Sequence, residues 1–578
     1  MVSRVLRLAA LAALAAPASG QAALGVAEAD AYVRAVFDAQ HADRYDTAAE
    51  AYLSLLARLG EPTPDPAEGE VLARHLRQLA PVVPEAERAG WTLGPTLDQG
   101  ILDALPPGTG ARVVRWWRAQ DPFPATPANE RLAEHLERVA VAVDAFAAED
   151  PRGYDDRGEV FVRLGAPDRR TEVVLSNALR AFDLRGRSPV GQLPANAYWL
   201  YDRLDAPAPF LFVRDSRRGP YRLAGSLDLL PPSLRRAGLG LRGDVEAEAL
   251  LAVMEDVYSQ LAVRHPVYGP ALDGVAVALG PARSPGRDAL RDAQRALALA
   301  QSTDSQAEGE RNDGVPASVS RLRDGLGDLP ASARWVRRLD ADGVTHVDVV
   351  WGVGEGAAWP SDRIARQLDA RGVEPADSVL LSASAVVLTD DFEPRGADHD
   401  HRTLPESAGA TGTLTVRLGR APARLALQWQ SRWAPRGERF RVGTLRPEAA
   451  LQPLQAGVLE MSDLTPLSGV RLDGTPAVAY PFDALPPDGR LALAFEVYGL
   501  GTDSEGRSSY TVTYRIAGRR GGPETSAGLT YDGGATSTEA VALDVTPWLG
   551  EAVEIEVRVR DERAGTEMAR SVAFAAPR

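Results

Sequence analysis

Residues 116–168 read WWRAQDPFPATPANERLAEHLERVAVAVDAFAAEDPRGYDDRGEVFVRLGAPD, and this stretch decides how the rest of the chain is organised. We predict one long amphipathic helix in it, with Thr126 as the N-cap and Pro127 at the first helical position. The predicted apolar face follows the helical period and consists of Leu132, Leu136, Val139, Val143 and Phe146. The charged residues off this face are Glu130, Glu134, Glu137 and Arg138.

A turn and a strand are predicted to follow the helix. Residues 151–158 combine proline, glycine and aspartate, the residue types that dominate turns. The run from Glu159 to Gly165 alternates in polarity, with Val160, Val162 and Leu164 on one side, and this period predicts a strand.

Further along the chain we predict an antiparallel hairpin, formed by residues 198–201 and 210–215 and packed against the long helix. Residues 245–263 and 287–302 have helical patterns, and the polar residues 302–316 are expected to form a linker or loop.

The hydrophobic period changes to two after about residue 331. Alternating runs separated by turn residues occur at 347–351, 425–429, 491–497 and 553–559, a pattern typical of β-sandwich domains. The predicted fold class is therefore α+β and multidomain. The expected parts are a helical region (21–110), an α+β module (111–225), a helical segment with linker (226–330) and two β-sandwich-like domains (331–450 and 451–578).

The first 20 residues have the pattern of a secretory signal peptide. Arg4 and Arg7 precede a short apolar run at 8–16, and small residues come before Gln21, where we expect cleavage. We therefore expect an exported protein, periplasmic, outer-surface or secreted, with no transmembrane segment after cleavage.

Residues 28–60 predict a helix pair, and its second half, YDTAAEAYLSLLARLG, resembles a tetratricopeptide unit. An unrelated helical hairpin explains the same pattern equally well. If the resemblance holds, it implies a surface of stacked helices for docking another protein.

Composition excludes several kinds of chemistry. The 578 residues contain no cysteine, which removes disulfides, thiolate nucleophiles and iron–sulfur ligation. All 64 basic residues are arginine, so no lysine is present to bind phosphate or form a Schiff base. The net charge of −15 and the lack of a basic tract argue against nucleic acid as a partner. No cofactor motif is found.

The stretch 116–168 resembles the GWxTD domain, a family of exported bacterial proteins. Weaker similarity extends to 197–201, 210–215, 461–464 and 495–516. The resemblance implies the fold and export, but no reaction. The matching motif residues, expected to be structural, include Trp117, Asp121, Pro122, Glu130, Arg157, Gly158, Gly165 and Pro167. The tryptophan that gives the family its name is missing, and Tyr154 and Asp155 stand where the family has tryptophan and threonine.

Candidate ligand or metal residues lie around the predicted turn and strand. Asp155, Asp156, Glu159 and Asp168 supply carboxylates, which hard cations require. The alternative is that these aspartates cap the turn and pair with Arg157 or Arg163. We assign no catalytic residue and no metal site.

A histidine pair and a tryptophan pair are two further candidates for ligand contacts. His399 and His401 lie close in sequence, but we expect a solvated polar loop there, with no third ligand to complete a zinc site. Trp116 and Trp117 could form an aromatic platform for a ligand, but we expect them to be core anchors, with one ring buried and one at the rim.

These observations favour a non-enzymatic interaction or structural protein of the cell envelope, with an envelope protein or an extracellular polymer as partner. The alternative is a carboxylate-dependent extracytoplasmic hydrolase, or a metal-binding protein, centred on the acidic turn. Carboxylates that converge without arginine partners would favour the hydrolase. Carboxylates that face arginine or backbone amides would count against it.

Overall fold

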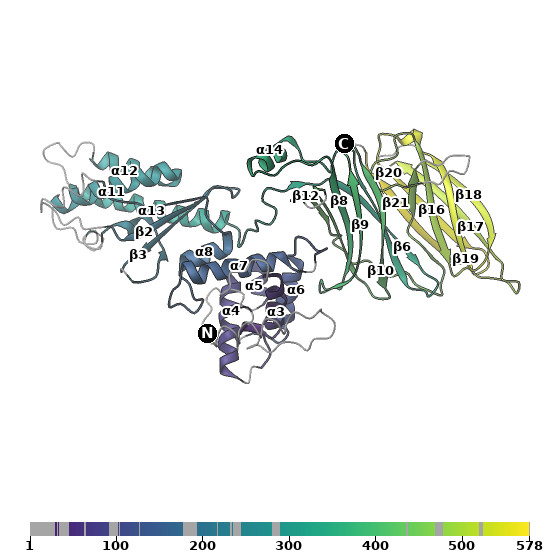
Figure 1. Ribbon diagram of the computed structural model, residues 1–578, viewed down its shortest axis with the longest axis horizontal. Coiled ribbons are helices and arrows are strands. Elements are labelled where there is room, and N and C mark those ends of the chain that lie inside the picture. The colour runs from purple at the N-terminus through teal and green to yellow at the C-terminus, as the bar shows by residue number, and fades with distance from the viewer. Residues whose placement is uncertain are drawn as a thin grey trace. The chain divides into compact units, whose positions relative to one another are not determined.

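The structure is a computed structural model of the chain. It describes residues 29–31, 33, 45–62, 65–91, 102, 105–126, 128–176, 193–216, 218–231, 234, 244–279, 289–434, 437–468, 478–518 and 524–576. The predicted signal peptide and its cleavage site lie outside the described residues, as do most of residues 28–44. The chain divides into two compact units, of residues Met1–Val114 with Arg131–Arg321 and of residues Arg115–Glu130 with Leu322–Arg578 (Figure 1).

The first unit begins with helices. They are α3 (Tyr45–Leu56), α4 (Pro66–Leu79), η2 (Ala80–Val82), α5 (Glu85–Gly90), α6 (Thr109–Ala119), α7 (Glu130–Ala145) and α8 (Asp156–Leu164). Local sequence explains the start of α4, because the Asp65 side chain accepts a hydrogen bond from the Ala67 amide at 2.9 Å and Pro66 takes the first helical position.

The long predicted helix is α7, and its start was predicted wrongly. The helix begins at Glu130, because the Thr126 hydroxyl donates to the Phe123 carbonyl at 2.7 Å and holds residues 123–126 in a turn. Pro127 lies outside the described residues. Four members of the predicted apolar face are buried, whereas Val143 is 39% exposed.

The predicted strand 159–165 is wrong, because these residues belong to helix α8. Asp155 caps this helix, with its side chain accepting from the Arg157 amide at 3.0 Å, and Gly165 ends it at a φ of +74°. The alternating residues Val160, Val162 and Leu164 are all buried, and Phe161 contacts Phe146 with ring centroids 5.7 Å apart. A short helix that is buried around most of its circumference shows no clear helical period, so the cap decides the structure.

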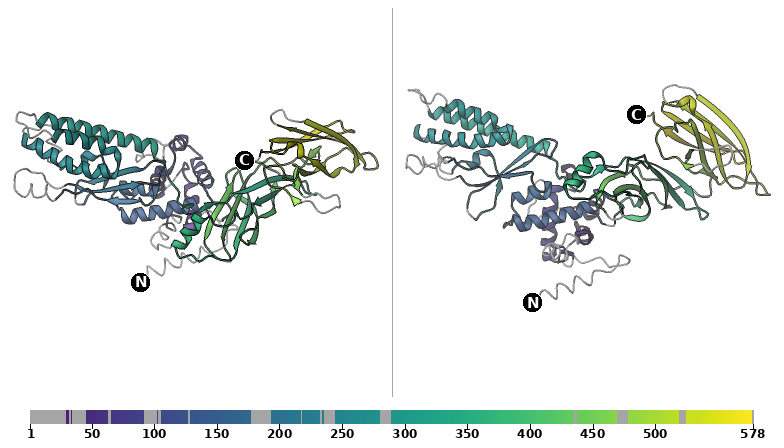
Figure 2. Two further views of the ribbon diagram at one scale, coloured as in Figure 1. Left: turned by 90° about the horizontal axis from the view of Figure 1, so that it is seen from above. Right: turned by 45° about the horizontal axis from the view of Figure 1, so that its top comes forward.

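A four-stranded antiparallel sheet follows, in the order β1 (Arg169–Thr171), β2 (Ala195–Tyr201), β3 (Ala208–Arg214) and β4 (Arg222–Leu223). The β2–β3 pair confirms the predicted hairpin. One face of the hairpin presents Trp199 to Phe146 of the segment after α7, with ring centroids 5.4 Å apart. Its other face shares a core with helices α11 (Asp244–Arg264), α12 (Gly269–Leu279) and α13 (Ala289–Gly314), which lie along the sheet in Figures 1 and 2.

Helix α13 corrects the linker expected at 302–316. The helix continues to Gly314, and Ala307 in this part is buried in the core. Asp304 explains the continuation, because its carboxylate accepts from the Ser226 and Leu227 amides of η3 (Ser226–Leu229) at 2.7 and 3.1 Å. The polar Asp304 thus makes a tertiary contact with η3, which the local sequence pattern of residues 302–316 does not predict.

The second unit contains two successive β-sandwiches, which confirms the α+β class with β-sandwich-like domains. In the first, a three-stranded sheet and a five-stranded sheet share one core around Trp351, Trp429 and Phe440. Its elements are β5 (Gly327–Asp328), β6 (Ala331–Leu339), β7 (Thr345–Val353), α14 (Asp362–Ala370), β8 (Val379–Leu388), β9 (Pro394–Leu404), β10 (Ala410–Gly419), β11 (Arg424–Trp433) and β12 (Arg439–Leu445).

The second sandwich has a separate core around Phe495, Tyr510 and Trp548. Its elements are β13 (Glu460–Met461), β14 (Thr465–Ser468), β15 (Val478–Ala479), β16 (Arg490–Tyr498), β17 (Ser508–Gly518), β18 (Glu524–Gly533), β19 (Thr536–Asp544), η5 (Thr546–Trp548), β20 (Val553–Asp561) and β21 (Glu567–Phe574). Among the helices that the structure describes, none is long and apolar enough to cross a membrane.

Candidate functional site: an arginine-lined pocket beside the acidic turn

The acidic turn connects α7 to α8 and is built around Tyr154. The Tyr154 ring is fully buried, and Ala147 forms an isolated antiparallel bridge with Tyr154. A Cβ atom at Gly158 would lie 2.7 Å from the Tyr154 ring, so only glycine fits there without movement. Tyr154 is thus a core aromatic residue.

Asp155 and Asp156 both reach the β4 edge of the sheet. The Asp155 carboxylate accepts from the Tyr221 amide at 3.1 Å and pairs with Arg157 at 2.8 Å. The Asp156 carboxylate accepts from the Leu223 amide at 2.7 Å. These carboxylates therefore join the turn to a segment about 66 residues further along the chain.

Asp168 lies next to β1, at the opposite edge of the same sheet. Its carboxylate accepts from the amides of Asp202 and Arg203 at 2.8 and 3.2 Å and pairs with the Arg203 guanidinium. The structure thus brings Asp155 and Asp156 together and leaves Asp168 apart. All three face backbone amides and arginine, the arrangement that counts against a carboxylate-dependent hydrolase.

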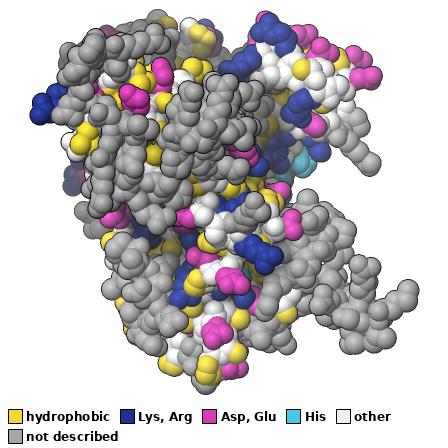
Figure 3. All heavy atoms as spheres, turned by 90° about the vertical axis from the view of Figure 1, so that its left-hand side faces the viewer, with side chains coloured by type: hydrophobic (Ala, Val, Ile, Leu, Met, Phe, Trp, Pro, Cys, Tyr) yellow, Lys and Arg dark blue, Asp and Glu magenta, His cyan; other side chains and the backbone are white. Residues whose placement is uncertain are grey.

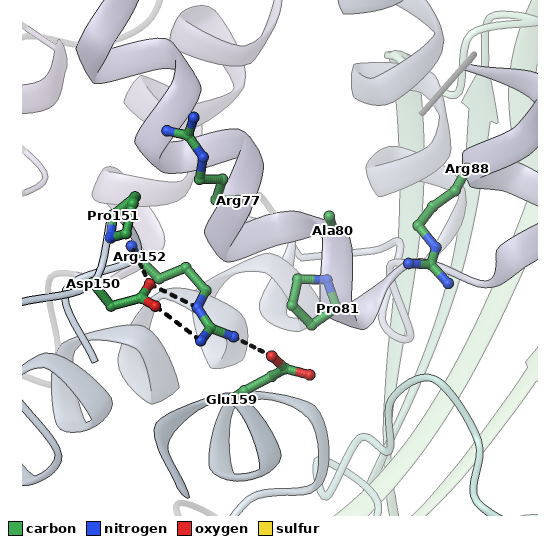
Figure 4. A pocket seen from close by; sticks show the side chains of 8 residues that line it. All are labelled: Arg77, Ala80, Pro81, Arg88, Asp150, Pro151, Arg152 and Glu159. Carbon is green, nitrogen blue, oxygen red and sulfur yellow. Dashed lines mark hydrogen bonds and ion pairs between the residues drawn. The ribbon is translucent and has the colours of Figure 1, made fainter. Parts of the chain in front are cut away.

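A pocket of about 290 Å³ opens beside this turn, within the first unit (Figure 4). Helix α4 and η2 contribute one wall, α5 a second, and the turn with α8 a third. The lining residues are Arg77, Ala80, Pro81, Arg88, Asp150, Pro151, Arg152 and Glu159. In the view of Figure 4, Pro81 separates Arg88 from the Arg152 cluster.

Arg152 is the centre of an ion-pair cluster in the pocket wall. Its guanidinium binds Asp150 at 2.9 Å, Asp156 at 3.4 Å, and Glu159. Partial burial raises the pKa of Asp150, but hydrogen bonds from Arg152 outweigh this effect and the pKa is lowered. Burial lowers the pKa of Arg152, but its hydrogen bond to Asp150 and the nearby Glu159 charge raise it overall. Arg152 is therefore neutralised by residues of the protein itself.

Arg88 differs from Arg152 in having no ion-pair partner among the residues that the structure describes. Its Nε atom is buried without a hydrogen-bond partner among them. Arg163 lies within its electrostatic range: burial lowers the pKa of Arg163, the Glu159 charge opposes this effect, and the Arg88 charge adds to it. The Arg163 guanidinium donates to the Ala317 and Pro316 carbonyls at 3.0 and 3.3 Å, so its charge is not cancelled by these contacts.

Gly165 and Pro167, two of the residues predicted to be structural, lie at the exit of α8. Gly165 lies against Arg138, since a Cβ at Gly165 would approach the Arg138 Nη2 atom to 3.2 Å. The Tyr201 hydroxyl donates to the Gly165 carbonyl at 2.9 Å, and Pro167 follows, half-buried, before β1. Arg138 itself pairs with the buried Glu134 at 2.5 Å and donates to the Val319 carbonyl at 2.8 Å.

Trp117, Asp121, Pro122 and Glu130 belong to the second unit. Trp117 is fully buried and Trp116 is half-buried, which confirms the expected core role for this pair. Pro122 is half-buried in the turn after α6.

Asp121 and Glu130 form a carboxyl pair at this turn. The Thr126 hydroxyl donates to the Glu130 carboxylate, the Phe123 amide donates to Asp121 at 2.9 Å, and burial raises the pKa of both carboxyl groups. Burial raises the pKa of Glu130 to about 8, and the Asp121 charge adds to the increase. The same segment is attached to the first sandwich, because Arg446 donates to the Ala119 carbonyl at 2.9 Å and to the Asp121 carbonyl.

His399 and His401 correct a second loop prediction, because both lie in strand β9. Each imidazole is exposed, and their Nδ1 atoms lie 2.9 Å from the hydroxyls of Ser384 and Ser382. Within the described residues, no group of three or more histidine or carboxylate side chains could hold a metal ion.

Sequence reasoning missed the pocket. Arg152 lies in the turn that was singled out, but Arg77 and Arg88 lie 75 and 64 residues before it in the chain, in helices without any motif of their own. Among the side chains that the structure describes, both basic and acidic ones occur on the face shown in Figure 3.

No protein-family model matches the chain. No curated protein matches its sequence. Solved structures resemble it weakly. Red sea bream transglutaminase is 8% identical over 48% of this chain and 34% of its own, with a TM-score of 0.14. A Bacteroides uniformis β-glucuronidase is 11% identical over 40% of this chain and 26% of its own, with a TM-score of 0.16. The C-terminal domain of the Streptococcus pyogenes antigen I/II-family protein AspA is 7% identical over 43% of this chain and 100% of its own, with a TM-score of 0.14.

The chain thus spans about a third or less of the length of the first two of these proteins. TM-scores this low do not establish a shared fold, and these resemblances assign no function.

Proposed function

We propose that this protein is an exported, GWxTD-like protein of the cell envelope that acts by binding another molecule, without catalysing a reaction. The observation that carries the proposal is the state of the candidate carboxylates. Asp155, Asp156 and Asp168 accept hydrogen bonds from backbone amides and pair with arginine, so they hold the fold together. An acid–base pair for hydrolysis would need groups that are available to the substrate.

The modular architecture supports binding as the role. A helical unit with an open pocket is followed by two β-sandwiches, each with its own core. Such modules commonly present surfaces to other molecules, although fold alone does not fix function. The partner in this proposal is an envelope protein or an extracellular polymer.

Export and binding are tested separately. For export, the full chain is expressed in a bacterium, and the protein in the extracytoplasmic fraction is analysed by mass spectrometry. We expect a mature N-terminus at Gln21. A full-length protein that stays in the cytoplasm would contradict export.

For binding, the purified protein is used for affinity capture from envelope extracts. A matched capture uses a heat-unfolded sample of the same protein. We expect an envelope component that the folded protein enriches and the unfolded sample does not. Identical captures, together with turnover of a model polymer that is lost in Asp156→Asn, would contradict the proposed role.

A further inference from the structure

We propose that the pocket beside the acidic turn binds the C-terminal carboxylate of a peptide, with Arg88 as the residue that pairs with it. This inference rests on the proposed binding function and names the chemistry of the ligand. It is drawn from the charges, the walls and the size of the pocket.

Three arginines line the pocket, and two of them, Arg77 and Arg152, already interact with other residues of the protein. Arg152 is neutralised by Asp150 and Glu159 inside the pocket wall. Arg88 has no carboxylate partner among the described residues, and its Nε donor is buried without an acceptor among them. The planar guanidinium matches a carboxylate through two parallel hydrogen bonds.

A second arginine adds to the positive field. Burial lowers the pKa of Arg163, the Glu159 charge opposes this effect, and the Arg88 charge adds to it, because the two guanidinium groups repel each other. An anion placed near Arg88 would offset this repulsion. The local excess of positive charge contrasts with the net charge of −15 for the whole chain.

The walls and the volume favour a peptide end. In the view of Figure 4, Ala80 and Pro81 give the pocket an apolar surface on the side of Arg88, suited to an aliphatic side chain beside the carboxylate. None of the residues that line the pocket is aromatic, although flat rings are the surface on which sugars commonly stack. A volume of about 290 Å³ has room for one or two terminal residues, and not for a polymer segment.

The test uses isothermal titration calorimetry on the purified full chain. The probe is an N-acetylated alanine–leucine dipeptide with a free carboxylate, and the matched probe is the same dipeptide as its carboxamide. We expect the carboxamide to bind on the order of 10- to 100-fold more weakly, because it loses a charge-assisted pair. Arg88→Gln should weaken the free acid by a similar factor, and Arg88→Lys by less.

Arg58→Gln is the control variant, because Arg58 is an exposed arginine of the same unit that pairs with Glu61 at 3.1 Å outside the pocket. This variant should bind as the wild type does. Circular dichroism melts must show that Arg88→Gln remains folded, and if it does not, Arg88→Lys and the carboxamide comparison decide.

Equal affinity for the acid and the amide would overturn the proposal. So would unchanged binding in Arg88→Gln, or tighter binding of inorganic phosphate than of the dipeptide. A partner captured from envelope extracts by both wild type and Arg88→Gln would leave the binding function standing and refute this ligand alone.

Discussion

The free energy of unfolding of the wild-type protein should fall as the pH rises, and Glu130→Gln should remove this decrease. The folded protein keeps a proton on the Asp121–Glu130 pair, because burial raises the pKa of Glu130 from 4.5 to about 8. The unfolded chain releases this proton near pH 4.5. The folded state therefore binds more protons between these values, and the free energy of unfolding falls as the pH increases.

The size of the effect follows from the shift. A rise from 4.5 to about 8 corresponds to an upper limit of about 5 kcal/mol at ~1.4 kcal/mol per pKa unit. Solvent reaches part of this carboxyl group, and its titration is coupled to that of Asp121, so we expect about 2 to 3 kcal/mol. The stabilising contribution is complete below about pH 4.5 and is lost by about pH 8.

The charged groups around the pair define the sign of the effect. Arg439 lies within electrostatic range of Glu130, and Arg446 is within range of Asp121. Both cations favour ionisation, yet burial outweighs them and the pKa of each carboxyl group stays raised. Deprotonation of the pair at high pH would place two negative charges together and weaken the turn of residues 121–130 on the first sandwich.

The assay is urea denaturation at pH values from 5 to 9, followed by tryptophan fluorescence. Trp116 and Trp117 lie next to the turn and should report its release. Glu130→Gln should show a shallower decrease of unfolding free energy with pH than the wild type. Glu137→Gln, an exposed glutamate of the same helix, is the matched control. A wild-type decrease that Glu130→Gln reproduces in full would refute the raised pKa of Glu130.

Three further predictions concern the acidic turn and the sheet. Asp155→Ala should lower the free energy of unfolding by about 2 to 3 kcal/mol in urea titrations, since it removes a helix cap and an amide acceptor. Gly158→Ala should cost about 1 to 3 kcal/mol through contact with the Tyr154 ring, and a double-mutant cycle with Tyr154→Leu should recover part of that cost. Asp168→Ala should cost about 1 to 2 kcal/mol and speed hydrogen exchange at the amides of the turn after β2.

Clear outcomes would contradict these structural roles. A stable Asp155→Ala protein would mean that the cap and the β4 contact are dispensable. Strictly additive costs in the Gly158 and Tyr154 cycle would argue against direct contact. Unchanged exchange in Asp168→Ala would show that its carboxylate does not protect those amides.

Secondary structure is predicted best from the sequence for elements that bury only one face. The hairpin of β2 and β3 and the sandwich strands alternate because each has two distinct faces, and the structure confirms them. The strand predicted at 159–165 is a helix, α8, where burial on most sides hides the helical period. The linker predicted at 302–316 is part of helix α13, where Asp304 is polar because it binds η3. The loop predicted around His399 and His401 is strand β9, because exposed strand residues can be as polar as those of a loop.

The candidate site was only half visible in the sequence. Asp155, Asp156 and Asp168 could be found as clustered acidic residues, but their partners are amides that lie tens of residues away. Arg88 has no local signal at all, because an arginine in a short helix is ordinary until the fold places it beside the turn.

The edge of the first sandwich has a consequence for self-association. Strand β9 is long, exposed and at the margin of its sheet, a geometry that invites pairing with a strand from another molecule. The Asp398 carboxylate accepts a hydrogen bond from the Thr415 amide of β10 at 2.8 Å, so this donor is not available to a strand of another molecule. Together with Arg395, Asp400 and Arg402, it makes this margin charged, so the protein is protected from growing into β-sheet aggregates there.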